Sequence, residues 1–157
     1  MNVCDGGETQ IHVTAGLVAL SAGRHESLIP AGFTCSMSAT GAPCTPVAYD
    51  AVREIRLLVQ HVDDGAEGPM LDLALDQILA HAGEPEAVTL WHLMQRVGPD
   101  NRARIYDRLA AIAPPPVDVS KELIAAADRP ALDRWWNSLG YGAVELWRTV
   151  APSLALR

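Results

Sequence analysis

The sequence predicts an α+β fold that is mostly α. A short β-hairpin or meander region at about residues 8–37 is followed by a compact bundle or array of about six short helices. Between residues 8 and 37, apolar and polar residues alternate with period two and glycines interrupt the runs, which is typical of short strands. Beyond residue 46, apolar residues recur every three or four positions, as on the buried face of a helix. The composition, 49% hydrophobic and 20% charged over 157 residues, is that of a globular protein.

Four strands of about five residues are expected in the first part of the chain. They span residues 10–14, 17–21, 26–29 and 33–37, and glycine-bearing turns separate them. The first two contain neither Lys nor Pro, residues that commonly protect the edge of a sheet. We therefore expect an open edge that binds a protein partner or a second copy of the chain, which would give a homodimer.

Helices are expected after a segment at residues 38–46, whose small residues, glycine and prolines are typical of a linker. The predicted organisation is a β segment at 1–37, a linker at 38–46 and an α-helical domain at 47–157. The first three expected helices cover about residues 47–62, Pro69 to Ala82 and Pro85 to Val97. The next three begin after caps: one runs from a cap at Asp100 to Ala113, a short one follows Ser120, and one runs from a cap at Asp128 to Gly140. A last helix is expected at 144–150.

Charge and motifs argue against several classes of function. The 19 acidic and 12 basic side chains give a net charge of −7, which disfavours a nucleic-acid partner or an anionic membrane surface. No apolar run approaches the roughly 20 residues of a membrane helix, so no membrane-spanning segment is expected in this chain. The sequence has no metal-ligand spacing, phosphate-binding glycine loop or nucleophile elbow. We therefore expect no catalytic residue, no metal and no cofactor.

The tryptophans are the most suggestive side chains in the sequence. Four of the eight aromatic residues are Trp: Trp91, Trp135, Trp136 and Trp147. They are a candidate partner interface, although packing in the core is the favoured interpretation, with one of the neighbours Trp135 and Trp136 facing inward. Asp72 and Asp76 would share a helix face as a carboxylate pair, for which a solvated surface is the favoured interpretation.

Two sets of segments resemble a known bacterial family. Residues 9–20 (TQIHVTAGLVAL) and 28–35 (LIPAGFTC) resemble the end of a FecR domain. The repeated sequence pattern of that family is a strand, a glycine-bearing turn, a Val-rich strand, a short polar turn and an apolar pair before Pro-x-Gly. The helical part is similar to C-terminal extensions of some FecR-domain proteins, in segments 87–93 (AVTLWHL), 104–110 (RIYDRLA), 114–117 (PPPV) and 132–136 (LDRWW). The β resemblance covers residues 3–37, under a quarter of the chain.

The resemblance implies a regulatory role. FecR-like proteins are usually membrane-anchored regulators whose periplasmic domain receives a signal and whose cytoplasmic end controls an extracytoplasmic sigma factor. This chain lacks the sigma-binding region, the membrane helix and about the first two-thirds of the β-domain, so sigma-factor control does not carry over. The resemblance implies a non-enzymatic sensor, regulatory or protein-interaction module, the distal piece of a larger receptor.

Two other functions stay open. One is a free-standing helical scaffold that binds a peptide or protein in a groove, and the other is a small enzyme of unknown class. A periplasmic location is expected if the chain is part of a longer FecR-like receptor, and a cytoplasmic one if Met1 is the true start. The DNA upstream of Met1 separates the receptor from the scaffold.

Overall fold

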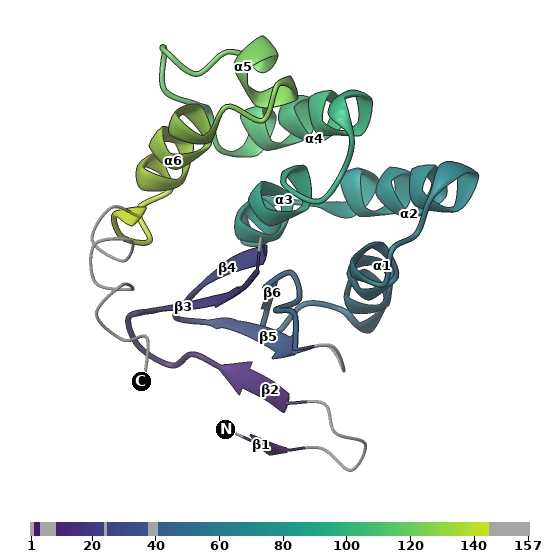
Figure 1. The fold of residues 1–157 in the computed structure, drawn as a ribbon, viewed down its shortest axis with the longest axis vertical. Coiled ribbons are helices and arrows are strands. Elements are labelled where there is room, and N and C mark those ends of the chain that lie inside the picture. Colours follow the sequence, from purple (N-terminus) through teal and green to yellow (C-terminus); the bar gives the residue numbers. More distant parts are fainter. Residues whose placement is uncertain (1, 4–8, 24, 38–40, 145–157) are drawn as a thin grey trace.

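The computed structural model describes residues 2–3, 9–23, 25–37 and 41–144 of the chain (Figure 1). In the structure, 50% of the residues are helical and 18% belong to a short antiparallel strand region. This confirms the predicted α+β fold that is mostly α. Within the described residues, no helix has the length and apolar character needed to cross a membrane.

The four expected strands are present, with two further short ones. In order, they are β1 (Asn2–Val3), β2 (Thr9–His12), β3 (Leu17–Ala22), β4 (His25–Pro30), β5 (Phe33–Met37) and β6 (Val47–Ala48). An antiparallel sheet has the order β1-β2-β5-β6, and β3 and β4 form a separate two-stranded ribbon. Strand β1 pairs with residues 9 and 10 of β2, so it covers the start of the edge that was expected to be open at residues 10–14.

The strands from β2 to β5 form one long hairpin that bends at its middle. The Val13 N–H donates to the Phe33 carbonyl at 3.1 Å, and the Ala31 N–H donates to the Gly16 carbonyl at 2.8 Å. Between these two bonds, residues 14 and 15 lie opposite the single residue Gly32, so the pairing register shifts by one residue. Gly16 and Gly32 both have positive φ at this bend, a conformation that glycine adopts without strain.

The helices follow the predicted order with shifted ends. They are α1 (Arg53–Asp63), α2 (Gly68–His81), the short 3-10 helix η1 (Glu84–Glu86), α3 (Ala87–Met94), α4 (Pro99–Ile112), α5 (Lys121–Ala125) and α6 (Arg129–Ser138). The expected caps at Ser120 and Asp128 are confirmed, since their side chains accept from Leu123 N and Ala131 N. The expected helix at 144–150 lies outside the described residues, apart from residue 144 itself.

Three helix starts differ from the prediction. Helix α3 begins at Ala87 and not at Pro85, because residues 84–86 form the 3-10 helix η1. Residues 47 and 48 pair with Thr34 and Phe33 as strand β6, so α1 begins at Arg53 and not at residue 47. Helix α4 begins at Pro99 after Gly98, so Asp100 lies in its first turn and is not its cap. Proline suits the first helical position, because the N–H that it lacks has no partner within the helix.

The strands and the helices share one hydrophobic core. The same cluster of buried residues contains Leu28 and Ile29 of β4 and the apolar side chains of α1 to α6. Every residue of α3 is buried, since this helix lies between the β3–β4 ribbon and α4 (Figure 1). Part of the predicted linker also packs on this core, because the Cys44 N–H donates to the Ser36 carbonyl and the Thr89 hydroxyl to that of Pro46.

Candidate functional site

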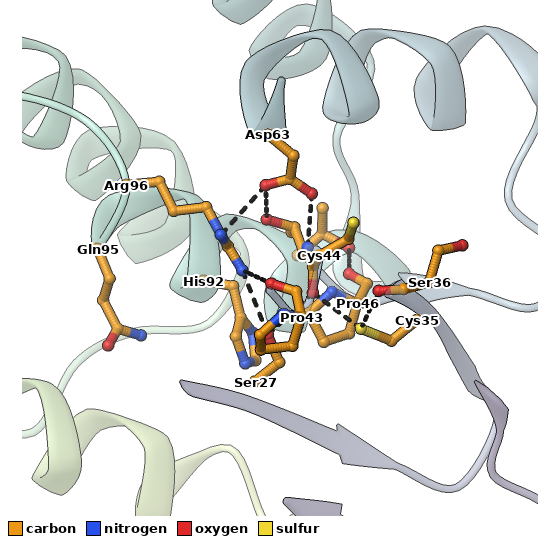
Figure 2. Close-up of polar contacts among 12 residues, drawn as sticks. Ser27, Cys35, Ser36, Pro43, Cys44, Pro46, Asp63, His92, Gln95 and Arg96 are labelled. Atoms are coloured by element: carbon orange, nitrogen blue, oxygen red, sulfur yellow. Dashed lines mark hydrogen bonds and ion pairs between the residues drawn. The ribbon is translucent and has the colours of Figure 1, made fainter. Parts of the chain in front are cut away.

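A buried polar cluster joins the β segment to the helices. We call it the Asp63 cluster, and it comprises Asp63 at the end of α1, Arg96 just after α3, Thr45, Ser27 of β4 and Cys35 of β5 (Figure 2). It joins an almost fully buried ion pair to the buried residues Ser27, Thr45 and Cys35. We therefore take it as the candidate site.

Three donors hold the Asp63 carboxylate. The Thr45 N–H donates to Oδ2 at 2.6 Å, and the Thr45 hydroxyl donates to Oδ1 at 2.7 Å. The Arg96 guanidinium contacts Oδ1 through Nε at 3.1 Å. The side chains of Arg96 and Asp63 are 13% and 4% exposed, so this ion pair is almost fully removed from water.

The rest of Arg96 holds the loop before β6. Its Nη2 donates to the Pro43 carbonyl at 2.8 Å and to the Ser27 hydroxyl at 3.2 Å. The Ser27 hydroxyl and the Cys35 thiol both donate to the Cys44 carbonyl, at 2.9 and 2.8 Å. These bonds give hydrogen-bond donors to the carbonyls of Pro43 and Cys44, which lie in the irregular loop before β6. Backbone polar groups that pack against a core require such partners.

Burial changes the pKa values of both acids in the cluster. Burial raises the pKa of Asp63, while the Arg96 charge and the two hydrogen bonds from Thr45 lower it. Burial also raises the pKa of Cys35 to about 12. The thiol is therefore protonated at neutral pH and is a poor nucleophile, because the thiolate is the reactive form.

His92 forms a second buried tie between strand and helix. Its Nε2 accepts the Leu28 N–H at 2.9 Å, so Nδ1 carries the proton and donates to the Val88 carbonyl at 2.8 Å. Both ring nitrogens are thus occupied by backbone groups, and burial lowers the pKa of His92 to about 3. The neutral imidazole acts as a fixed hydrogen-bonding link and not as an acid or base.

We expect the fold to lose stability in mild acid because of His92. Its pKa falls from the ordinary value of 6.5 to about 3 in the fold, so the unfolded chain takes up the proton first as the pH is lowered. This contribution is fully present above about pH 6.5 and declines toward pH 3. At about pH 5 the free energy of unfolding should be lower by about 2 kcal/mol than at about pH 7.5, as measured by urea unfolding.

A His92→Gln variant isolates this effect. The amide oxygen of glutamine can accept the Leu28 N–H without titrating, so the variant should show a flatter pH profile. The raised pKa of Asp63 gives a slope of opposite sign in both proteins, so the difference between them reports His92 alone. His61→Gln on the exposed side of α1 is the matched control for the substitution itself. Equal slopes for wild type and His92→Gln would contradict the assignment.

A cavity of about 420 Å³ lies beside the Asp63 cluster. Strands β2, β5 and β6 and helix α1 bound it, and Gln10, Thr34, Gln60 and Asp64 are among its walls. These hydroxyl, amide and carboxylate groups can hold a small polar molecule. Across the described residues, no three His, Cys, Asp or Glu side chains lie close enough together to hold a metal ion.

Three of the four predicted interface tryptophans are core residues. Trp91 is 1% exposed and Trp135 and Trp136 are 0% exposed. Each indole N–H donates to a backbone carbonyl: Trp91 to Leu132 at 2.9 Å, Trp135 to Ala113 and Trp136 to Gly142 at 3.0 Å. Their burial favours the core interpretation and leaves these three rings no surface for a partner, whereas Trp147 lies outside the described residues.

The expectation that only one of Trp135 and Trp136 faces inward was wrong. Neighbouring helix positions point about 100° apart, and α6 is covered in both directions. The Trp135 ring packs on Tyr106 of α4 with centroids 5.1 Å apart. The Trp136 ring packs on Trp91 of α3 at 4.8 Å.

The carboxylate pair of α2 belongs to the surface. Asp72 and Asp76 are 58% and 65% exposed, and both contact the Arg104 guanidinium. This agrees with a solvated helix face, where such pairs contribute little stability.

Asp63, Arg96 and His92 are not among the residues that the sequence singled out. Two signals could have found two of them. His92 is a titratable residue within the apolar run of α3, and a buried polar group requires a partner. Asp63 ends α1, where the negative end of the helix dipole disfavours a carboxylate unless a cation lies beside it.

No protein-family model, no curated protein and no solved structure matches this chain. Its function is therefore inferred from the residues and contacts described above.

Proposed function

We propose that this chain is a non-enzymatic FecR-like sensor, regulatory or protein-interaction module, the distal piece of a larger signalling receptor. The proposal rests on the observation that its buried titratable groups make hydrogen bonds and an ion pair that hold the fold together. His92 and the Asp63–Arg96 pair connect the β3–β4 ribbon and the loop between β5 and β6 to helices α1 and α3 through hydrogen bonds and an ion pair. A nucleophile or general base needs a free lone pair at the reaction site, and these groups are engaged in holding the fold.

The arrangement suits a module that senses or transmits a contact. The strands lie on α3 through a buried hydrogen bond from Leu28 to His92. A partner that displaced β4 would therefore act directly on the central helix of the core. The periplasm is the proposed location, since the receiving domain of FecR-like regulators lies there.

The native N terminus tests the receptor assignment. Mass spectrometry of the protein isolated from its own organism should find peptides encoded in frame upstream of Met1, including an apolar membrane segment and further strands. N-terminal sequencing that begins at Met1, with an in-frame stop codon just upstream, would contradict the assignment.

A free-standing helical scaffold is the alternative, and one observation favours it. A second cavity, of about 260 Å³, lies among the helices and is lined by Glu84, Ile112, Pro114, Leu139 and Tyr141 among others. Its walls combine apolar and aromatic side chains with the polar side chains of Glu84 and Ser138, a mixture that suits a bound peptide. A native N terminus at Met1 would favour this function over the receptor.

A further inference from the structure

In the β3–β4 ribbon, the observed hydrogen bonds determine which residues of β3 bond to β4 and which point away from it. Residues of β3 pair with β4 from Leu17↔Pro30 to Ala22↔His25, and the Ala31 N–H donates to the Gly16 carbonyl. Hydrogen-bonded and non-hydrogen-bonded pairs alternate in an antiparallel ladder. Val18, Leu20 and Ala22 therefore bond to β4, whereas the backbone N–H and C=O groups of three other residues point away from β4. These are Leu17, Ala19 and Ser21.

The outer edge of β4 is already occupied. By the same alternation of hydrogen-bonded and non-hydrogen-bonded pairs, the N–H of Leu28, which lies opposite Ala19, points away from β3. His92 of α3 accepts this N–H at 2.9 Å. Helix α3 therefore covers this edge of the ribbon (Figure 1). The alternation deduced from Gly16 and the bond observed at Leu28 agree independently.

The outer edge of β3 has no such cover in the part of the chain that the structure describes. No backbone hydrogen bond there joins Leu17, Ala19 or Ser21 to a further strand or loop. The strand reads Leu-Val-Ala-Leu-Ser-Ala and contains no charge and no proline, the residues that commonly prevent edge pairing. The outward backbone groups of three residues, on an uncharged edge, form a template for another strand.

We infer that β3 pairs antiparallel with β3 of a second copy of this chain, across a two-fold axis at Ala19. The three outward-facing residues are spaced symmetrically about Ala19. A two-fold axis there places Ala19 opposite Ala19 of the second copy, and Leu17 opposite Ser21. Every outward N–H and C=O group then finds a partner, and the two ribbons become one four-stranded sheet.

The chemistry of the strand favours a second copy as the occupant. The chain carries a net charge of −7, so two copies repel each other wherever their charged surfaces meet. Strand β3 has no charged side chain, so pairing two copies of it brings no like charges together. Because one pair of strands buries less than the roughly 1,600 Å² of a standard interface, a weak dimer is expected.

Ala19→Pro tests the pairing without breaking the ribbon. The Ala19 N–H points away from β4, so proline removes an outward donor and none of the ladder bonds within the ribbon. At about 100 μM, wild type should sediment as a dimer and Ala19→Pro as a monomer, with at least about a tenfold weaker association. Circular dichroism should show the same fold for both proteins.

A charge exchange tests the register. In the inferred dimer the two residues at position 19 face each other, so Ala19→Lys and Ala19→Glu should each repel their own copies. Each variant alone should be a monomer, and an equimolar mixture of the two should form a mixed dimer. Ser21→Lys, which places its charge beside Leu17 of the second copy, is the comparison variant that should not be rescued by Ser21→Glu.

Each result decides the inference. A wild-type chain that is monomeric at about 100 μM overturns it, as does a dimer that Ala19→Pro and Ala19→Lys leave intact. Failure of the Lys and Glu variants to pair overturns the two-fold axis at Ala19. None of these results depends on the native N terminus, so failure here is distinguishable from failure of the receptor assignment.

Discussion

Replacing Trp136 with alanine is expected to lower the free energy of unfolding by about 3–5 kcal/mol. The ring is 0% exposed, packs on Trp91 and Tyr141, and donates its N–H to the Gly142 carbonyl. Alanine removes these contacts and leaves a cavity that the neighbouring helices cannot fill without moving. Urea unfolding at neutral pH measures the loss.

Trp135→Ala should cost about as much, although position 135 neighbours position 136 on the same helix. Its ring is also 0% exposed and contacts Tyr106. Leu73→Ala is the matched control, because Leu73 on α2 is 53% exposed and its truncation should change stability by no more than about 0.5 kcal/mol. A mild effect at either tryptophan would show that its side of α6 is open to solvent.

Elements that depend on local sequence were predicted well. The positions of β3 to β5 follow from period-two runs between glycines, and the caps at Ser120 and Asp128 follow from hydroxyl and carboxylate side chains before apolar stripes. In each case the residues that define the element lie within a few positions of one another.

Elements that depend on distant partners were not predicted. Residues 47–48 carry no pattern that separates a strand from the first turn of a helix, and pairing with Phe33 and Thr34 decides between them. The burial of both Trp135 and Trp136 likewise requires α3 and α4 to lie on two sides of α6. A helical period identifies one buried face and cannot report a second neighbour.

The candidate site depends on distant pairing most of all. His92 meets Leu28 across 64 positions of sequence, and Arg96 meets Ser27 across 69. The sequence shows that a histidine and an aspartate stand in unfavourable local settings. It does not identify the backbone groups that make those settings favourable in the fold.

Asp63→Asn is expected to destabilise the fold by about 1–3 kcal/mol, because the amide NH2 group replaces an oxygen that accepts the Thr45 N–H, and two donors then face each other. The asparagine side chain keeps the shape of the aspartate, and the Thr45 hydroxyl can still donate to its oxygen, but the Thr45 N–H loses its acceptor. The negative charge 3.1 Å from Arg96, whose side chain is only 13% exposed, is lost as well. Urea unfolding at neutral pH should show the loss as a lower midpoint with an unchanged slope.

The double variant Asp63→Asn with Arg96→Met separates charge from packing. If the cost of the single variant arises from the unpaired guanidinium, methionine removes that charge and should recover part of the stability. Asp107→Asn is the matched control for a surface pair, since Lys121 and Asp107 are 41% and 61% exposed, and it should cost less than about 1 kcal/mol. Equal costs for Asp63→Asn and Asp107→Asn would contradict a buried ion pair at the junction of strand and helix. A double variant less stable than Asp63→Asn alone would mean that Arg96 holds the Pro43 carbonyl and Ser27 more strongly than it requires Asp63.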